Sequence, residues 1–95
     1  MKINLQTLKF EAKQSLIDYV DDKVGKLSRF DDKIISAEVT LSIDGDAIEN
    51  KYCDIRLVVP GYDDFVKKNA ATFEEAILNS VDVLQKIVKR KKERL

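Results

Sequence analysis

The sequence of 95 residues contains no histidine and no tryptophan, and only one cysteine and one proline. The lack of histidine removes the side chain that most often acts as general base and as metal ligand. Cys53 has neither a histidine to activate it nor a second cysteine for a disulfide, so we expect a buried, unreactive thiol. No glycine-rich phosphate loop or dinucleotide motif occurs. We therefore expect a protein that is not an enzyme and that takes no cofactor and no small-molecule substrate.

Adjacent aspartates occur three times, and such pairs can belong to a site for a hard metal ion. They are Asp21-Asp22, Asp31-Asp32 and Asp63-Asp64. Neighbouring side chains on a helix or strand diverge, and Asp44-Gly45-Asp46 lacks the rest of a calcium-binding loop. The five serines have no base beside them. We interpret these residues as solvated surface groups and expect no metal site.

Long hydrophobic runs are absent from the sequence, and no segment approaches the length that spans a bilayer. The N-terminal residues lack the apolar stretch of a secretory signal, and a single cysteine is typical of a reducing compartment or of indifference to redox. We therefore expect a cytoplasmic protein without membrane contact. A chain of this length predicts one domain over residues 1–95, and its 44% hydrophobic residues must supply one core.

Alternation of apolar and polar residues predicts four strands, over residues 2–8, 34–43, 51–59 and 62–69. In the second strand the apolar face is expected to carry Ile35, Ala37, Val39, Leu41 and Ile43. The last strand has no defined buried face, because Phe65 and Val66 are adjacent. Residues 44–50 read as an acidic hairpin loop, and Pro60-Gly61 as a second turn.

Apolar residues with a helical period predict a first helix over about residues 12–29, without a clear capping residue at its start. Thr72 and Glu75 match a capping box that opens a last helix toward the C-terminus. The two apolar stripes are Leu16, Val20, Val24 and Leu27, and Ile77, Val81, Leu84 and Val88. The order is β-α-β-β-β-α. Both helices must cover one face of the four-stranded sheet, which predicts a two-layer α+β sandwich whose other face stays wet.

Charge is distributed unevenly although the net charge is zero. Residues 86–95 hold six cations and one anion, whereas residues 1–85 hold 11 cations and 16 anions. Lys23, Lys26 and Arg29 recur every third residue on the first predicted helix, and Lys86, Lys89, Arg90 and Arg94 occupy the exposed side of the last. If the helices pack side by side, the two sets line a shared face that can follow a phosphate backbone. The scattered aromatic residues favour recognition of folded RNA by shape and backbone.

Other interpretations of these charges stay open from the residues alone. Cations near the end of a helix also complement its dipole, and charged chain ends often only solvate. In that case the acidic turns or the wet sheet face could contact a protein, and the domain would be a protein-interaction module.

The whole chain resembles the short ribosome hibernation-promoting factors, also called ribosome-associated inhibitor or sigma-54 modulation proteins. The resemblance rests on the start Met1-Lys-Ile-Asn-Leu5, on the first-helix segment from Leu16 to Leu27, and on Phe73-Glu-Glu-Ala-Ile77 ahead of a basic helix. It implies the same β-α-β-β-β-α fold, related to double-stranded RNA-binding domains. It also implies binding to the small ribosomal subunit and its rRNA near the decoding site, where the domain blocks mRNA and tRNA and keeps idle ribosomes inactive, as in stress or stationary phase.

The family's basic positions correspond to Lys23, Lys26, Lys86 and Arg90. To these we add Lys89 and Arg94 as supporting contacts, and Arg29, Lys91 and Lys92 as further candidates. The acidic loop from Asp44 to Glu49 is expected to point away from RNA.

The sequence departs from the family pattern at three positions. Thr72 and Leu78 replace acids at the start of the last helix, and Val83 replaces a basic residue. The domain is also neutral where relatives tend to be basic. The alternative is therefore a divergent paralogue that acts as a protein-interaction module without ribosome binding. We expect a monomer off the ribosome. Because the chain ends at Leu95, without the extra C-terminal domain of long family members, we expect it not to pair ribosomes through such a domain.

Overall fold

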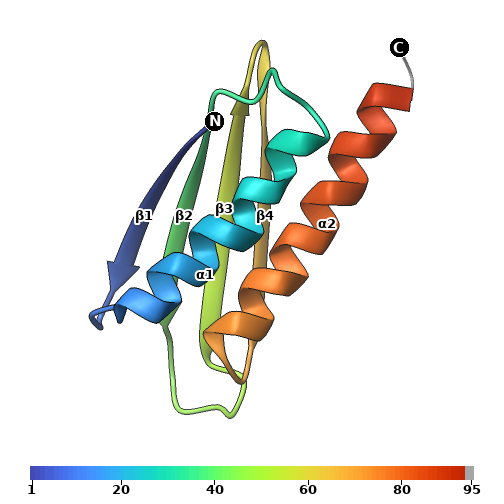
Figure 1. Cartoon of the computed structure of the whole chain (residues 1–95). Coiled ribbons are helices and arrows are strands. Elements are labelled where there is room, and N and C mark those ends of the chain that lie inside the picture. Colours follow the sequence, from blue (N-terminus) through green and yellow to red (C-terminus); the bar gives the residue numbers. More distant parts are fainter. Residues whose placement is uncertain (94–95) are drawn as a thin grey trace.

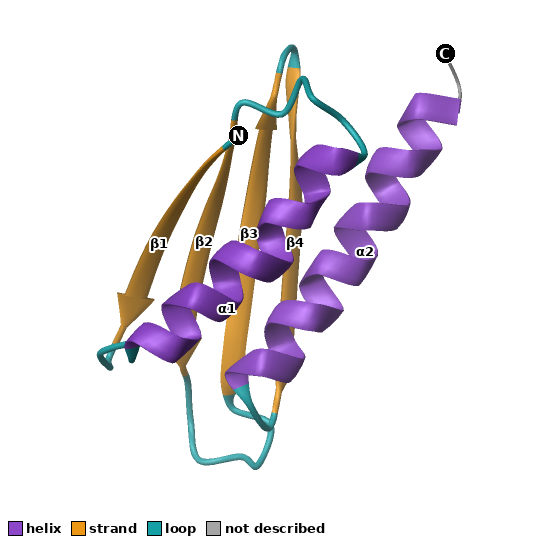
Figure 2. Ribbon diagram, in the orientation of Figure 1, coloured by secondary structure: helices purple, strands orange, loops and turns teal. Residues whose placement is uncertain are grey.

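The computed structural model, which describes residues 1–93, has a four-stranded sheet with two helices on one face (Figures 1 and 2). Its elements are β1 (Lys2–Leu8), α1 (Gln14–Gly25), the 3₁₀ helix η1 (Lys26–Arg29), β2 (Ser36–Ile43), β3 (Lys51–Val59), β4 (Tyr62–Ala70) and α2 (Phe73–Glu93). The predicted order β-α-β-β-β-α and the two-layer α+β architecture are confirmed.

The strands lie side by side in the order β1-β2-β3-β4. β1 pairs with β2 in parallel, and the other two pairings are antiparallel. A parallel pair requires a crossover connection, and α1 provides it on the face that both helices cover. The sheet is therefore mixed, and in β2 the face away from the helices carries Ser36, Glu38, Thr40 and Ser42.

The register fixes the face of β4, which the sequence alone left open. One row across the sheet runs Leu5, Val39, Ile55 and Val66. Val66 therefore points to the helices and is buried, whereas its neighbour Phe65 lies on the open face and is 56% exposed.

The core lies between the sheet and the two helical stripes. Val20, Val24 and Leu27 are buried on the first stripe, and Leu16 is half-buried at its end. Ile77, Val81, Leu84 and Val88 are all buried on the second. Fully burying a side chain of this size contributes about 1.5–3 kcal/mol, so the predicted stripes are confirmed as the basis of the fold.

Three predicted elements have boundaries that differ from the structure; the last strand, predicted over residues 62–69, runs to Ala70. The first helix begins at Gln14 rather than near residue 12, and its last turn has 3₁₀ geometry. The second strand begins at Ser36, and Ile35, which was expected on the apolar face, is 57% exposed. Ile34, two residues before the strand begins, is buried in its place.

Capping differs between the two helices. Oγ1 of Thr72 accepts a hydrogen bond from the backbone N–H of Glu75 at 3.2 Å, which confirms the N-cap half of the predicted capping box. Lys13 is the N-cap residue of α1 and makes no side-chain hydrogen bond to the helix. The stacked rings of Phe10 and Phe73, with centroids 4.5 Å apart, join the loop before α1 to the start of α2.

Cys53 is completely buried on β3, as predicted. Burial in apolar surroundings raises the pKa of its thiol to about 12. The hydroxyl of Ser80, also buried, donates a 3.1 Å hydrogen bond to the backbone carbonyl of Cys53 and so ties α2 to the sheet. Over residues 1–93, neither helix combines the length and apolar character needed to cross a membrane.

Candidate nucleic-acid interface

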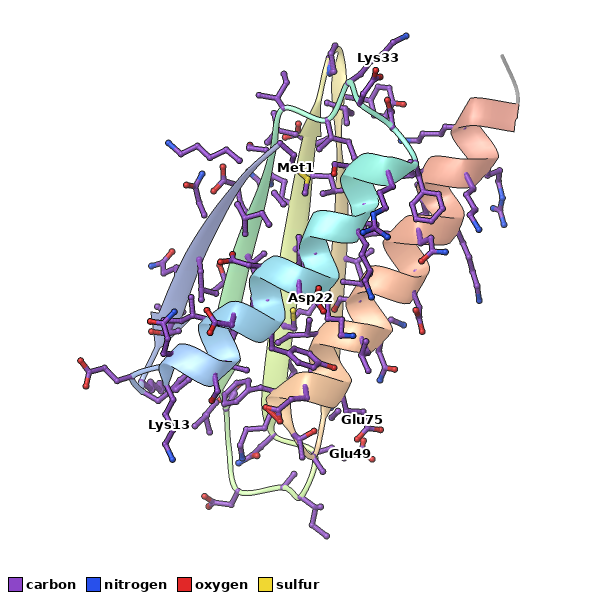
Figure 3. All side chains as sticks on the ribbon, in the orientation of Figure 1. Met1, Lys13, Asp22, Lys33, Glu49 and Glu75 are labelled. Atoms are coloured by element: carbon purple, nitrogen blue, oxygen red, sulfur yellow. The ribbon has the colours of Figure 1, made fainter. Side chains whose placement is uncertain are left out.

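The two helices run alongside each other and in the same direction, so that their basic C-terminal turns lie at one end of the molecule (Figure 1). The acidic loop between β2 and β3 lies at the other end. Figure 3 shows Glu49 and Glu75 at this acidic end and Lys33 at the opposite one. The uneven charge of the sequence therefore becomes a polarity along the helices.

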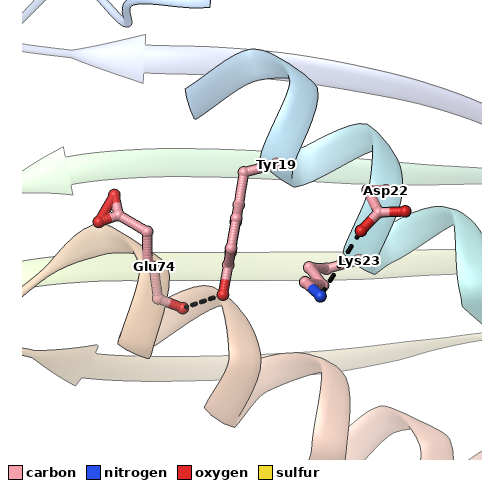
Figure 4. Close-up of polar contacts among 4 residues, drawn as sticks. All are labelled: Tyr19, Asp22, Lys23 and Glu74. Carbon is pink, nitrogen blue, oxygen red and sulfur yellow. Dashed lines mark hydrogen bonds and ion pairs between the residues drawn. The ribbon is translucent and has the colours of Figure 1, made fainter. Parts of the chain in front are cut away.

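On α1, Lys23 lies on the flank that faces α2. The hydroxyl of Tyr19 donates to the backbone carbonyl of Glu74 on α2 at 3.4 Å, which identifies this flank (Figure 4). The ammonium of Lys23 lies 5.5 Å from the centroid of the Tyr19 ring and 3.5 Å from a carboxylate oxygen of Asp22. Lys23 is thus half-buried beside the seam between the helices.

The next two predicted cations lie on η1, the 3₁₀ helix that continues α1. Side chains three residues apart eclipse each other in a 3₁₀ helix. Lys26 and Arg29, at the two ends of η1, therefore project to the same side. Arg29 is exposed and Lys26 is half-buried, so these two predicted cations lie on one side of η1.

On α2 the cations point in different directions. The ammonium of Lys89 lies 4.8 Å from the centroid of the Phe30 ring, which closes η1, so Lys89 belongs to the seam. Lys86 and Arg90 are exposed. At about 100° per residue both lie on the solvent side of the helix, far from the buried Leu84.

Lys91 faces away from the seam toward the sheet. Its ammonium lies 2.5 Å from Oδ1 of Asp64 and 3.7 Å from the centroid of the Tyr62 ring, both on β4. Of the remaining predicted contacts, Arg94 and the side chain of Lys92 lie outside the described residues. Of the other predicted cations, Lys23 and Lys89 contact rings at the seam, Lys26 is half-buried on η1, and Arg29, Lys86 and Arg90 are exposed.

Tyr19 and Phe30 also belong to this surface, and sequence reasoning missed both. The spacing of Tyr19 and Lys23, four residues apart on one helix, was the only available signal. The contact between Phe30 and Lys89 joins segments 59 positions apart and arises from packing alone. In the described part of the chain, no three acidic or cysteine side chains gather closely enough to hold a metal ion.

Comparison with solved structures supports the same fold. The chain is similar to the crystal structure of the N-terminal domain of Protein Y from Thermus thermophilus, with 32% identity and a TM-score of 0.82 over 95% of this chain and 98% of that one. It also has the fold of a ribosomal subunit interface protein from Coxiella burnetii, with 16% identity and a TM-score of 0.82 over 98% and 99% of the two chains. A comparison with curated proteins gave no match.

Residues 3–95 match the family described as sigma 54 modulation protein / S30EA ribosomal protein. The match covers nearly the whole chain, and the protein belongs to this family. The resemblance inferred from the sequence is confirmed.

Proposed function

We propose that this domain binds the small ribosomal subunit and its rRNA near the decoding site and inhibits translation there. The description of the family to which the chain belongs names a ribosomal protein, and this supports ribosome association. The relatives named above, a Protein Y domain and a ribosomal subunit interface protein, support it further. The observation that carries the proposal is that two neighbouring helical segments on one face of the sheet both carry cations, with Lys23 and Lys26 on α1 and η1 and Lys86 and Arg90 on α2.

The proposed mechanism is steric and needs no chemical step. Lysine and arginine side chains contact phosphates, which fixes position and orientation without reading sequence. The body behind them measures 44 × 23 × 19 Å and is built on one continuous core. A rigid body of this size excludes mRNA and tRNA from the space that it occupies.

The polarity of the molecule supports a defined orientation on RNA. Asp44, Asp46 and Glu49 in the β2–β3 loop and Glu74 and Glu75 in the first turn of α2 lie at the end away from the basic turns. Because RNA is a polyanion, this end is repelled while the basic end is attracted. The acidic loop therefore points away from the rRNA in the proposed complex.

The test is cosedimentation with purified small ribosomal subunits. A Lys86→Glu/Arg90→Glu variant reverses two exposed cations on α2. Its matched control, Lys67→Glu/Lys68→Glu, makes the same change of charge at exposed residues of β4. We expect the α2 variant to bind at least about tenfold more weakly, because each phosphate contact is largely electrostatic, and the control to bind like wild type. Equal loss in both variants, or no binding by the wild-type domain at low salt, would overturn the proposal.

A second candidate function is a protein-interaction module, and one observation favours it. Ile48, at the acidic β2–β3 loop, is 87% exposed. An apolar side chain flanked by Asp46 and Glu49 suits a partner with a basic, partly apolar surface. If this is the function, Ile48→Ser should remove partner binding, whereas the α2 variant should leave it unchanged.

A further inference from the structure

The seam between α1, η1 and α2 contains two aromatic rings, and a lysine ammonium lies against each of them. Lys23 is 5.5 Å from the Tyr19 centroid, and Lys89 is 4.8 Å from the Phe30 centroid. The negative face of an aromatic ring attracts a cation in this way. Two of the predicted cations therefore lie against aromatic rings and not only in solvent.

The two rings differ in how they are held. Tyr19 is anchored by the hydrogen bond of its hydroxyl to the backbone of α2, and its lysine comes from the same helix (Figure 4). Phe30 packs against the core, and the lysine that contacts its ring, Lys89, comes from α2. The ammonium on Phe30 is thus a movable group on a flexible stem that covers a half-buried ring.

Cations lie close to Phe30 along the chain as well as across the seam. Lys26 and Arg29 precede it on η1, and Lys89 lies over its ring. An aromatic ring bordered by cations is the combination with which proteins hold unpaired nucleotides, since the base stacks on the ring and the phosphates meet the cations.

We propose that Phe30 is a stacking position for an unpaired nucleobase of the bound RNA. The base takes the face of the ring that Lys89 covers in the free protein, and the Lys89 ammonium moves to an adjoining phosphate. The exchange is favourable because base–aromatic stacking is stronger than an exposed ammonium–ring contact, and because the lysine gains a charged partner. This inference rests on the proposed function and adds single-stranded nucleotides to the RNA that the domain recognises.

The first test uses a ligand that does not depend on the ribosome. Binding of an octamer of adenylate is compared with binding of an abasic octamer with the same backbone, at low salt. We expect the wild-type domain to bind the adenylate octamer about tenfold more tightly, the Phe30→Leu variant to bind both alike, and Phe30→Tyr to keep the preference. The control Phe65→Leu, which alters an exposed ring on the opposite sheet face, should also keep it. Equal binding of the two octamers by the wild-type domain would overturn the inference.

The second test uses small ribosomal subunits and separates this inference from the proposed function. Phe30→Leu should weaken subunit binding about tenfold without changing its salt dependence, because no phosphate contact is lost. If the Phe30→Leu variant binds small subunits as tightly as the wild type does, stacking is refuted and the proposed function is unaffected. Tighter binding of the adenylate octamer than of the abasic octamer, without any binding to small subunits, would support stacking and refute the proposed function. Thermal unfolding of each variant checks that the compared proteins are folded.

Discussion

The ammonium of Lys91 lies 2.5 Å from Oδ1 of Asp64 and forms an ion pair between the last turns of α2 and the start of β4. The centroid of the Tyr62 ring lies 3.7 Å from the same ammonium. The side chain of Asp64 is only 12% exposed. This contact holds the C-terminal part of α2 against the sheet, and it therefore orients the exposed side that carries Lys86 and Arg90.

Removing the carboxylate should loosen the end of α2. We expect Asp64→Asn to lower the free energy of unfolding by about 1 kcal/mol, a modest value because the Lys91 side chain is 36% exposed and water screens the pair. The neighbouring Asp63, which is exposed on the other face of β4, provides the control Asp63→Asn. Urea unfolding of both variants measures the difference, and equal stabilities would show that the ion pair does not hold the helix.

The same pair should show a defined pH dependence. Desolvation alone would lower the pKa of Lys91, but its interactions with Asp64 and Tyr62 outweigh this effect and raise the pKa above 10.5. A raised pKa means that the folded state holds the proton more tightly, so the stabilisation is complete below pH 10.5 and is lost as pH rises through the folded value. The difference in stability between wild type and Lys91→Met should therefore shrink in strong alkali, and a difference that grows there would contradict this.

Cys53 should give a second alkaline effect at a lower pH. Its pKa is about 12 in the folded protein against 9.0 for an unperturbed thiol, so stability is complete below pH 9 and falls as pH rises toward 12. Between pH 8 and pH 10 the wild-type domain should lose about 1 kcal/mol more than Cys53→Ala. Because the thiol is completely buried, a thiol reagent at pH 8 should react only at the rate of unfolding. Rapid labelling of the folded protein would show that the thiol is accessible.

The N-terminus of α1 should be easy to stabilise. Lys13 has the extended backbone of an N-cap residue, but its side chain offers no acceptor to the free N–H groups, and the first turn has no acid. We expect Lys13→Asp to raise the free energy of unfolding by about 1 kcal/mol, through the new cap hydrogen bond and the favourable helix dipole. Lys13→Ala removes the cation without adding an acceptor and should give little or no gain. If both variants raise the free energy of unfolding by a similar amount, the gain comes from removing the Lys13 charge and not from a new cap hydrogen bond.

The helices and strands could be predicted because most of their faces follow one period. Ala37, Val39 and Leu41 alternate as β2 requires, and all three are buried. Prediction was less successful where two apolar residues are adjacent. Ile34 and Ile35, and Phe65 and Val66, each present two possible faces, and only the tertiary register decides between them. The parallel pairing of β1 with β2 likewise depends on how α1 crosses the sheet.

The candidate site could be predicted only as far as each helix by itself allows. The exposure of Lys86 and Arg90 follows from the apolar stripe of α2. Lys91 lies only about 100° from Arg90, yet it is held by Asp64 on β4, a partner that no helical pattern reveals. The contact of Lys89 with Phe30 depends in the same way on how the two helices pack.

The salt dependence of binding to small ribosomal subunits tests the proposed role of the helical face most directly. If Lys23, Lys26, Lys86 and Arg90 each neutralise a phosphate, the logarithm of the binding constant should fall with the logarithm of salt concentration at a slope of about −3 to −4. The Lys86→Glu/Arg90→Glu variant should bind more weakly with a slope smaller by about two, while Lys67→Glu/Lys68→Glu keeps the wild-type slope. Binding that is insensitive to salt, or an α2 variant with the wild-type affinity and slope, would contradict RNA recognition by this face.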